Sequence, residues 1–140
     1  MERVNVTSEL ENFQRQVAPI LAEMEASANA HDTDRHLAAY SNDPALVFII
    51  NGEIIQGWDA LRERQRQWWD DGNAKSVYTY IGEPTCAMFG KDHGLTTHLI
   101  AARARLPDGQ VRERQLAFTA LWARQAEGWR MIYAHESSTR

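Results

Sequence analysis

The sequence predicts an α+β fold in which N-terminal helices pack on one face of an antiparallel sheet. Three observations favour this class: apolar residues recur every three or four positions near the start, β-branched and aromatic runs dominate the second half, and short turns join those runs. Consecutive strands joined by short turns form an antiparallel meander, and helices on one face of it make the class α+β. The expected element order is α-α-β-β-α-β-β-β-β, within a single domain of residues 1–140.

A long first helix is predicted by a face of apolar residues spaced three, four or seven apart: Leu10, Phe13, Val17, Leu21, Met24 and Ala28. Ser8 and Glu11 form a capping box at its start, because each side chain can bond a backbone amide that has no partner within the helix. Pro19 lies inside this pattern and has no amide hydrogen to donate, so we expect a kink near residues 15–19.

Two shorter helices are expected further along the chain. The second runs through Tyr40, because Asp32 or Thr33 can cap its first turn. The third covers residues 58–71 and ends at Gly72, since a glycine readily adopts the left-handed conformation that closes a helix.

The strands are predicted by β-branched and aromatic runs between turn residues. ALVFIING is the first strand, and its Asn51-Gly52 pair predicts a tight hairpin into the return strand EIIQG. Longer strands are expected over residues 75–89, 93–106 and 111–124, and in the final stretch GWRMIYAHESSTR. The turn Pro107-Asp108-Gly109 joins two of them.

Composition narrows the classes of partner. The net charge is −4, which does not attract a nucleic-acid backbone, and no apolar run is long enough to suggest a membrane span. Cys86 is the single cysteine, so no disulfide within the chain is possible. We find no secretory signal pattern, and we expect a cytoplasmic protein without nucleic-acid or membrane partners.

Three stretches resemble those of known families. NAHDTDRHLAAYSNDPALVF and GWDALRERQ resemble segments of the nuclear transport factor 2-like superfamily, which has a cystatin-like fold. The W-x-x-I-x-x-H-x-S pattern of GWRMIYAHESS resembles the last strand of the calcium/calmodulin-dependent protein kinase II association domain and of small SnoaL-like proteins. The resemblance covers about residues 8–138 and implies a cone, in which a curved antiparallel sheet wraps the helices and leaves a pocket at the open end.

The same resemblance argues against one activity of this superfamily. The steroid isomerases have a general base, an oxyanion tyrosine and a partner acid, which match Phe48, Met24 and Ala120 here. None of these three side chains can move or donate a proton, so we expect no isomerisation of 3-oxo-steroids. The pocket arginines of the kinase association domain match Ile100 and Ala120, so that anion site is not implied either.

Two histidines are candidate catalytic residues. Strand alternation places His98 on the inner face with Thr96 and Ile100, and it places His135 on the same face as Trp129 and Met131. Either imidazole, alone or with Tyr40 or Tyr80, has the chemistry of an acid or base near neutral pH. The alternative is that both are histidines at the core edge whose hydrogen bonds are satisfied within the protein.

Large aromatic residues and one arginine complete the predicted ligand-binding set: Tyr40, Phe48, Trp58, Trp69, Tyr80, Arg114, Phe118, Trp122, Tyr133 and Ser137. Arg114 shares a strand face with Phe118 and would favour an acidic ligand, although its hairpin also fits a solvated charge ladder. The tryptophans fit core or dimer packing as well, and Trp68 and Trp69 cannot both face the same way.

The sequence contains no phosphate-binding, dinucleotide, nucleophile-elbow or zinc motif, so we expect neither a cofactor nor a metal site. The leading hypothesis is a small-molecule-binding protein with an aromatic-lined pocket. The alternatives are an enzyme of the dehydratase, cyclase or isomerase type, and a non-catalytic assembly module. We also expect a homodimer through an apolar outer sheet face, formed by Leu99, Ala101, Ala117, Thr119 and Leu121.

Overall fold

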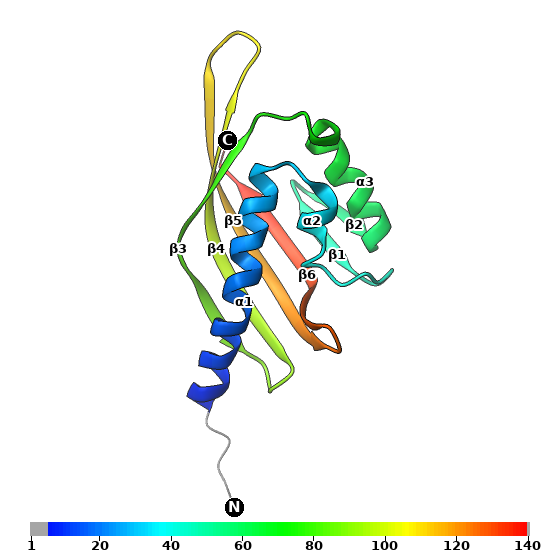
Figure 1. The fold of residues 1–140 in the computed structure, drawn as a ribbon, viewed down its shortest axis with the longest axis vertical. Coiled ribbons are helices and arrows are strands. Elements are labelled where there is room, and N and C mark those ends of the chain that lie inside the picture. Colours follow the sequence, from blue (N-terminus) through cyan, green and yellow to red (C-terminus); the bar gives the residue numbers. More distant parts are fainter. Residues whose placement is uncertain (1–5, 140) are drawn as a thin grey trace, which may run out of the picture.

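The computed structural model of the protein describes residues 6–139 and has the predicted order of elements (Figure 1). The elements are α1 (Val6–Asn29), α2 (Thr33–Leu37), β1 (Val47–Ile50), β2 (Glu53–Gln56), α3 (Trp58–Trp68), a 3-10 turn (Asp70–Gly72), β3 (Val77–Met88), β4 (His93–Arg105), β5 (Val111–Gln125) and β6 (Gly128–Ser138). None of the helices within this range is long and apolar enough to cross a membrane.

The six strands form one sheet in the order β2-β1-β6-β5-β4-β3. The four long strands make the predicted antiparallel meander, and β1 and β2 form the predicted hairpin at Asn51-Gly52. One pair was not predicted: β1 lies parallel to β6, with Val47 opposite Tyr133. Strand patterns indicate which residues alternate but not which distant strand becomes a neighbour, so this pairing depends on the tertiary fold.

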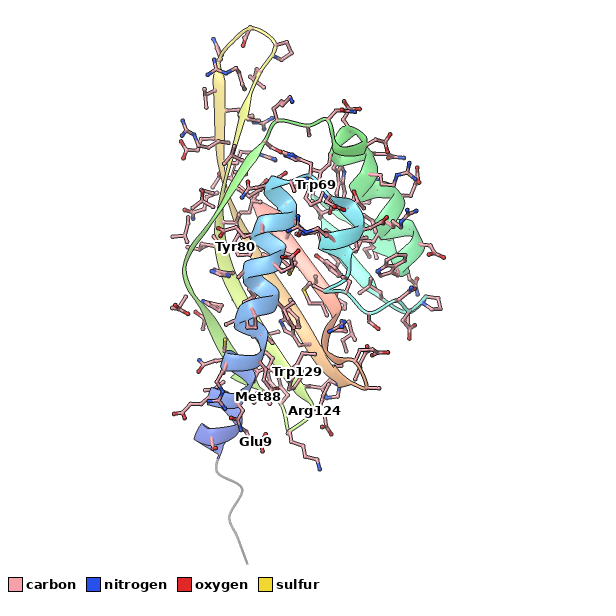
Figure 2. The ribbon with its side chains drawn as sticks, viewed as in Figure 1. Glu9, Trp69, Tyr80, Met88, Arg124 and Trp129 are labelled. Carbon is pink, nitrogen blue, oxygen red and sulfur yellow. The ribbon has the colours of Figure 1, made fainter. Side chains whose placement is uncertain are left out.

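The long helix α1 crosses the concave face of the curved sheet (Figure 1). Its predicted apolar face is buried there from Phe13 to Ala28, while Leu10 is half-buried. Phe13 lies so close to β4 that a Cβ on Gly94 would come within 2.5 Å of its ring atoms. The Phe13 ring also meets Trp129 edge-on, with 4.9 Å between ring centroids. Trp129 and Trp69 lie toward opposite ends of the molecule (Figure 2), so aromatic side chains fill the concave side along its length.

The helix ends differ from the predictions in detail. Helix α1 begins at Val6, so Ser8 lies inside its first turn, and the helix continues through Pro19, which is exposed. The buried Val17 and Leu21 on either side of the proline hold both halves of the helix on the sheet. Asp32 caps α2 as predicted, accepting a hydrogen bond from the Arg35 amide at 3.2 Å.

Helices α2 and α3 are both shorter than predicted. Helix α2 ends at Leu37 rather than continuing through Tyr40, and α3 ends at Trp68 rather than Asp71. A 3-10 turn follows α3, in which Asp71 has a φ of 49° and Gly72 a φ of 94°. Gly72 therefore closes this extra turn instead of the α-helix itself.

A β-bulge in β6 decides which residues of the last strand face inward. Leu121 is paired with Tyr133, but Trp122 is paired with Met131, so Ile132 is an extra residue without a partner on β5. One extra residue reverses the alternation of a strand. Met131 is therefore buried before the bulge, and Ala134 and Glu136 face inward after it.

The predicted inward positions of Tyr133, His135 and Ser137 are therefore wrong. All three are exposed on the convex face of the sheet, beyond the bulge at Ile132. The change from apolar to polar in this half of the strand marks a change of face rather than a change of depth.

Candidate functional site

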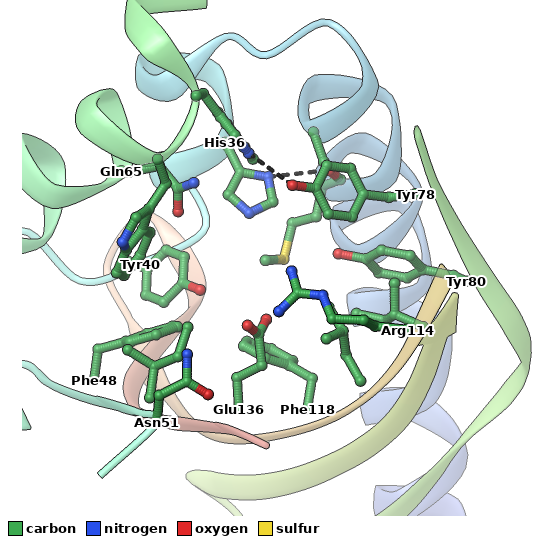
Figure 3. A pocket seen from close by; sticks show the side chains of 17 residues that line it. His36, Tyr40, Phe48, Asn51, Gln65, Tyr78, Tyr80, Arg114, Phe118 and Glu136 are labelled. Atoms are coloured by element: carbon green, nitrogen blue, oxygen red, sulfur yellow. Dashed lines mark hydrogen bonds between the residues drawn. The ribbon is translucent and has the colours of Figure 1, made fainter. Parts of the chain in front are cut away.

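A cavity of about 320 Å³ lies on the concave side, bounded by α1, α2, the end of α3 and strands β1, β3, β4, β5 and β6 (Figure 3). Its walls are mainly aromatic and aliphatic: Phe48, Trp68, Trp69, Ile100, Leu116 and Phe118. Phe48 is at the centre of an aromatic cluster, with its ring centroid 6.1 Å from those of Tyr40 and Trp68 and 6.4 Å from that of Phe118. Apolar walls with a few polar groups are typical of small-molecule sites.

Eight polar side chains from separate parts of the chain line the cavity, and Asn51, Gln65 and Tyr78 are three of them (Figure 3). His36 comes from α2, Tyr40 from the segment after it, Tyr80 from β3, Arg114 from β5 and Glu136 from β6. Neither the Arg114 side chain nor the Glu136 side chain has an ion-pair or hydrogen-bond partner among the described residues. Polar groups in such a place are costly unless they find partners.

Glu136 is the carboxyl of this cluster. Burial raises its pKa from 4.5 to about 7, although the positive charge of Arg114 opposes that rise. A carboxyl with this pKa is present in both protonation states near neutral pH. It can therefore donate or accept a proton without a large change in solution conditions.

The two tyrosine hydroxyls remain protonated. Burial raises the pKa of Tyr40 well above its ordinary value, and burial also raises the pKa of Tyr80. The negative charge of Glu136 adds to both shifts, which indicates that the two hydroxyls and the carboxyl are close enough to interact. Both hydroxyls are available as hydrogen-bond donors to a ligand.

His36 adds an acceptor. Its Nδ1 lies 3.0 Å from the carbonyl oxygen of Met24, which can only accept, so Nδ1 carries the hydrogen. Burial lowers the pKa of His36 to about 4, and the ring is neutral at neutral pH. Its Nε2 therefore has a free lone pair, and this atom faces the cavity (Figure 3).

His98 lies behind the cavity wall rather than in it. The residue is buried, its Nε2 is 2.9 Å from the carbonyl oxygen of Gly82, and its ring meets Tyr80 edge-on at 5.1 Å between centroids. Its side chain borders a separate depression between α1 and β3. Among the described residues, its Nδ1 is buried without a hydrogen-bond partner. The position at the core edge therefore agrees with the alternative reading, but only one of the two ring nitrogens is satisfied. The edge-on contact supports the position of Tyr80.

The cavity brings together six of the ten residues predicted to bind a ligand: Tyr40, Phe48, Trp69, Tyr80, Arg114 and Phe118. Trp122 is instead fully buried in the core, where its Nε1 donates to Thr96 Oγ1 at 2.9 Å. Trp58 borders a different depression and donates from Nε1 to the carbonyl oxygen of Leu37. Tyr133 and Ser137 lie on the convex face, as described for β6. The part that the six residues play in binding stays a prediction.

Sequence reasoning missed Glu136 and His36. Glu136 belongs to the set of β6 residues that strict alternation assigns to the outer face, and nothing in the sequence marks the extra residue at Ile132. His36 lies on the same helix turn as the apolar Leu37, a position that gives no signal of a cavity. Among residues 6–139, no group of three His, Cys, Asp or Glu residues could hold a metal ion.

The residues that match the steroid isomerase positions are apolar parts of this structure. Phe48 and Met24 line the cavity, and Ala120 is fully buried in β5. The polar cluster therefore occupies other positions of the fold: Glu136 follows the bulge of the last strand, and Tyr80 is on β3.

Comparisons with known proteins agree with this architecture. The chain is similar to a nuclear transport factor 2-like superfamily protein from Salmonella enterica serovar Typhimurium, at 16% identity and a TM-score of 0.75, over 96% of this chain and 93% of that one. It is similar to the association domain of CaMKII from C. elegans, at 16% identity and a TM-score of 0.72, over 93% and 98% of the two chains. It is also similar to a ketosteroid isomerase-like protein from Erwinia carotovora atroseptica, at 15% identity and a TM-score of 0.72, over 91% and 96%.

These likenesses concern the fold alone, because the identities are low. No curated protein sequence matches the chain. A family model does: the one described as the SnoaL-like domain matches residues 17–140, which include every element from the middle of α1 to the end of β6. On that match, the chain belongs to the SnoaL-like domain family.

Proposed function

We propose that this protein binds a small, flat organic molecule in the cavity on the concave side of the sheet. The observation that carries the proposal is the convergence of polar groups, Arg114 and Glu136 among them, on a cavity whose other walls are aromatic and aliphatic (Figure 3). Arg114 and Glu136 have no bonding partner among the described residues, so a ligand that bonds to them offsets the cost of their burial. The aromatic walls favour a planar ligand body.

Intrinsic tryptophan fluorescence tests this proposal, because Trp68 and Trp69 line the cavity. We expect saturable quenching by a bicyclic aromatic probe such as 2-naphthol. Leu116→Phe narrows the cavity and is expected to weaken the binding. Leu99→Phe, on the exposed convex face, adds the same bulk elsewhere and is expected to leave it unchanged. Equal binding by both variants would contradict the proposed site.

A second candidate function is proton-transfer catalysis, and Glu136 is the observation that favours it. Its carboxyl has a pKa of about 7 and lies near the hydroxyls of Tyr40 and Tyr80. A base beside two neutral donors can remove a proton next to a carbonyl while the donors hold the oxygen. This arrangement supports an enzyme of the dehydratase, cyclase or isomerase type.

Proton exchange measures this activity without knowledge of the natural substrate. The flat bicyclic ketone 2-tetralone exchanges the hydrogens beside its carbonyl with deuterium from solvent, which proton NMR follows. We expect the wild-type protein to accelerate this exchange and Glu136→Gln to abolish the acceleration. If the two proteins gave the same rate, Glu136 would not be a base for such substrates.

Assembly is the remaining alternative and is compatible with ligand binding. On the convex face, Leu121 lies opposite Tyr133, and Leu99 and Tyr133 are 41% and 42% exposed. An apolar patch of this kind favours a homodimer through the outer sheet face. Sedimentation analysis at micromolar concentration is expected to show a dimer, and a species of only 16.0 kDa would contradict it.

A further inference from the structure

We propose that the ligand of the cavity is a flat monocarboxylic acid whose carboxylate is bound by Arg114. This inference rests on the proposed binding function and names its ligand class. The relevant features are the position of Arg114, the charges around it, and the donors that lie beside it.

Arg114 differs from the other arginines of the β4–β5 hairpin. Arg103, Arg105 and Arg112 are exposed, whereas Arg114 is partly buried and lines the cavity. It lies on the inner face of β5 beside Phe118, and its partner on β4 is the small Ala102, which leaves room for the guanidinium on that face. Among the described residues no carboxylate pairs with Arg114, so its five N–H donors remain free for a ligand.

The charges that face Arg114 leave the cavity suited to an anion. The titratable groups of the lining are His36 from α2, Tyr40 after it, Tyr78 and Tyr80 from β3, and Glu136 from β6. His36 is neutral because burial lowers its pKa to about 4, and Tyr40 and Tyr80 stay protonated. Glu136 is the only negative charge among them, and with a pKa of about 7 it is readily protonated. With Glu136 protonated, the cavity carries one uncompensated positive charge.

A carboxylate fits the donors that remain. A guanidinium binds a carboxylate through two parallel hydrogen bonds, which gives both strength and orientation. The hydroxyls of Tyr40 and Tyr80 and the protonated Glu136 are further donors on the same cavity. A planar ring attached to the carboxylate would then lie among Phe48, Trp68 and Phe118.

Binding of a carboxylate ligand changes the protonation of Glu136. A carboxylate beside Glu136 repels the ionised form of that side chain, so binding favours its protonated form. The complex therefore takes up a proton when it forms near neutral pH. The affinity for the carboxylate ligand should be constant below about pH 6 and should weaken by up to tenfold per pH unit above about pH 8.

The experiment compares 2-naphthoate with its neutral analogue 2-naphthamide, which has the same shape and lacks the charge. Binding is followed by tryptophan fluorescence at about pH 6. We expect the acid to bind at least roughly tenfold more tightly than the amide, the scale of one charged hydrogen-bond pair. Arg114→Met should remove this preference, Arg114→Lys should retain part of it, and the exposed Arg112→Met is the matched control.

Glu136→Gln provides an independent readout, because glutamine imitates the protonated carboxyl and cannot titrate. Its naphthoate affinity should not change between about pH 6 and pH 9, whereas that of the wild type should fall. Equal binding of acid and amide, or full acid affinity in Arg114→Met, would overturn this inference and leave the binding function intact. Failure of both probes to bind would overturn the binding function and this inference together.

Discussion

Replacement of Glu136 by glutamine tests the physical state of the cavity directly. Folding raises the pKa of this carboxyl from 4.5 to about 7, because burial disfavours its charged form. The folded protein therefore holds this proton to higher pH than the unfolded chain does. Its favourable contribution to stability is complete below about pH 4.5 and is lost as the pH rises through about 7.

The magnitude follows from the shift. One pKa unit corresponds to about 1.4 kcal/mol, so ionisation of Glu136 costs the folded state about 3 kcal/mol once the pH exceeds 7. Glutamine has nearly the same shape and no ionisation to oppose. The free energy of unfolding of Glu136→Gln should therefore rise relative to wild type by about 2–3 kcal/mol between about pH 5 and pH 9. For a chain of this length, that equals roughly 10 °C in melting temperature.

Thermal melts followed by circular dichroism at about pH 5, 7 and 9 measure this difference. Glu127→Gln is the matched control, since Glu127 is exposed in the β5–β6 turn and its replacement should give no trend with pH. A stability gap between wild type and Glu136→Gln that stays constant across this range would refute the reasoning. Such a result would mean that ionisation of Glu136 does not destabilise the folded state. The carboxylate would then be solvated by water in the cavity or paired with a positive charge.

Three further outcomes are expected. Burial lowers the pKa of His36 to about 4, so the stability of the wild type falls as the pH drops from about 6.5 towards 4. His36→Gln should lose this part of the pH dependence, and urea unfolding at about pH 6.5 and pH 4 measures the difference. Gly94→Ala should cost about 1–3 kcal/mol in the same assay, because the new Cβ would come within 2.5 Å of the Phe13 ring; an unchanged midpoint would show that the helix can shift. His135→Ala should leave the affinity for naphthoate within about twofold of wild type, since His135 is exposed on the convex face; a larger loss would argue for a site on that face.

Local patterns were sufficient for most of the fold. The apolar face of α1, the Asn51-Gly52 hairpin and the meander of long strands each follow from spacing and turn chemistry that act over a few residues. The same alternation correctly placed Arg114 and Phe118 on one face of β5, because that strand keeps its register with β4 from Val111 to Ala123. These parts of the structure could be predicted because each depends on near neighbours in the chain.

The centre of the site depends on contacts that no short pattern contains. Strict alternation would have placed His135 inside and Glu136 outside, and the extra residue at Ile132 exchanged them. A bulge is an extra residue in one strand of an antiparallel pair, so it is defined by how β5 and β6 pair and not by residues that are close in the sequence. His36 likewise acquires its fixed proton position and lowered pKa only where α2 packs against the Met24 carbonyl of α1. Sequence alone determined the order of the elements and six of the residues that line the cavity, while tertiary pairing decided which acid and which imidazole face it.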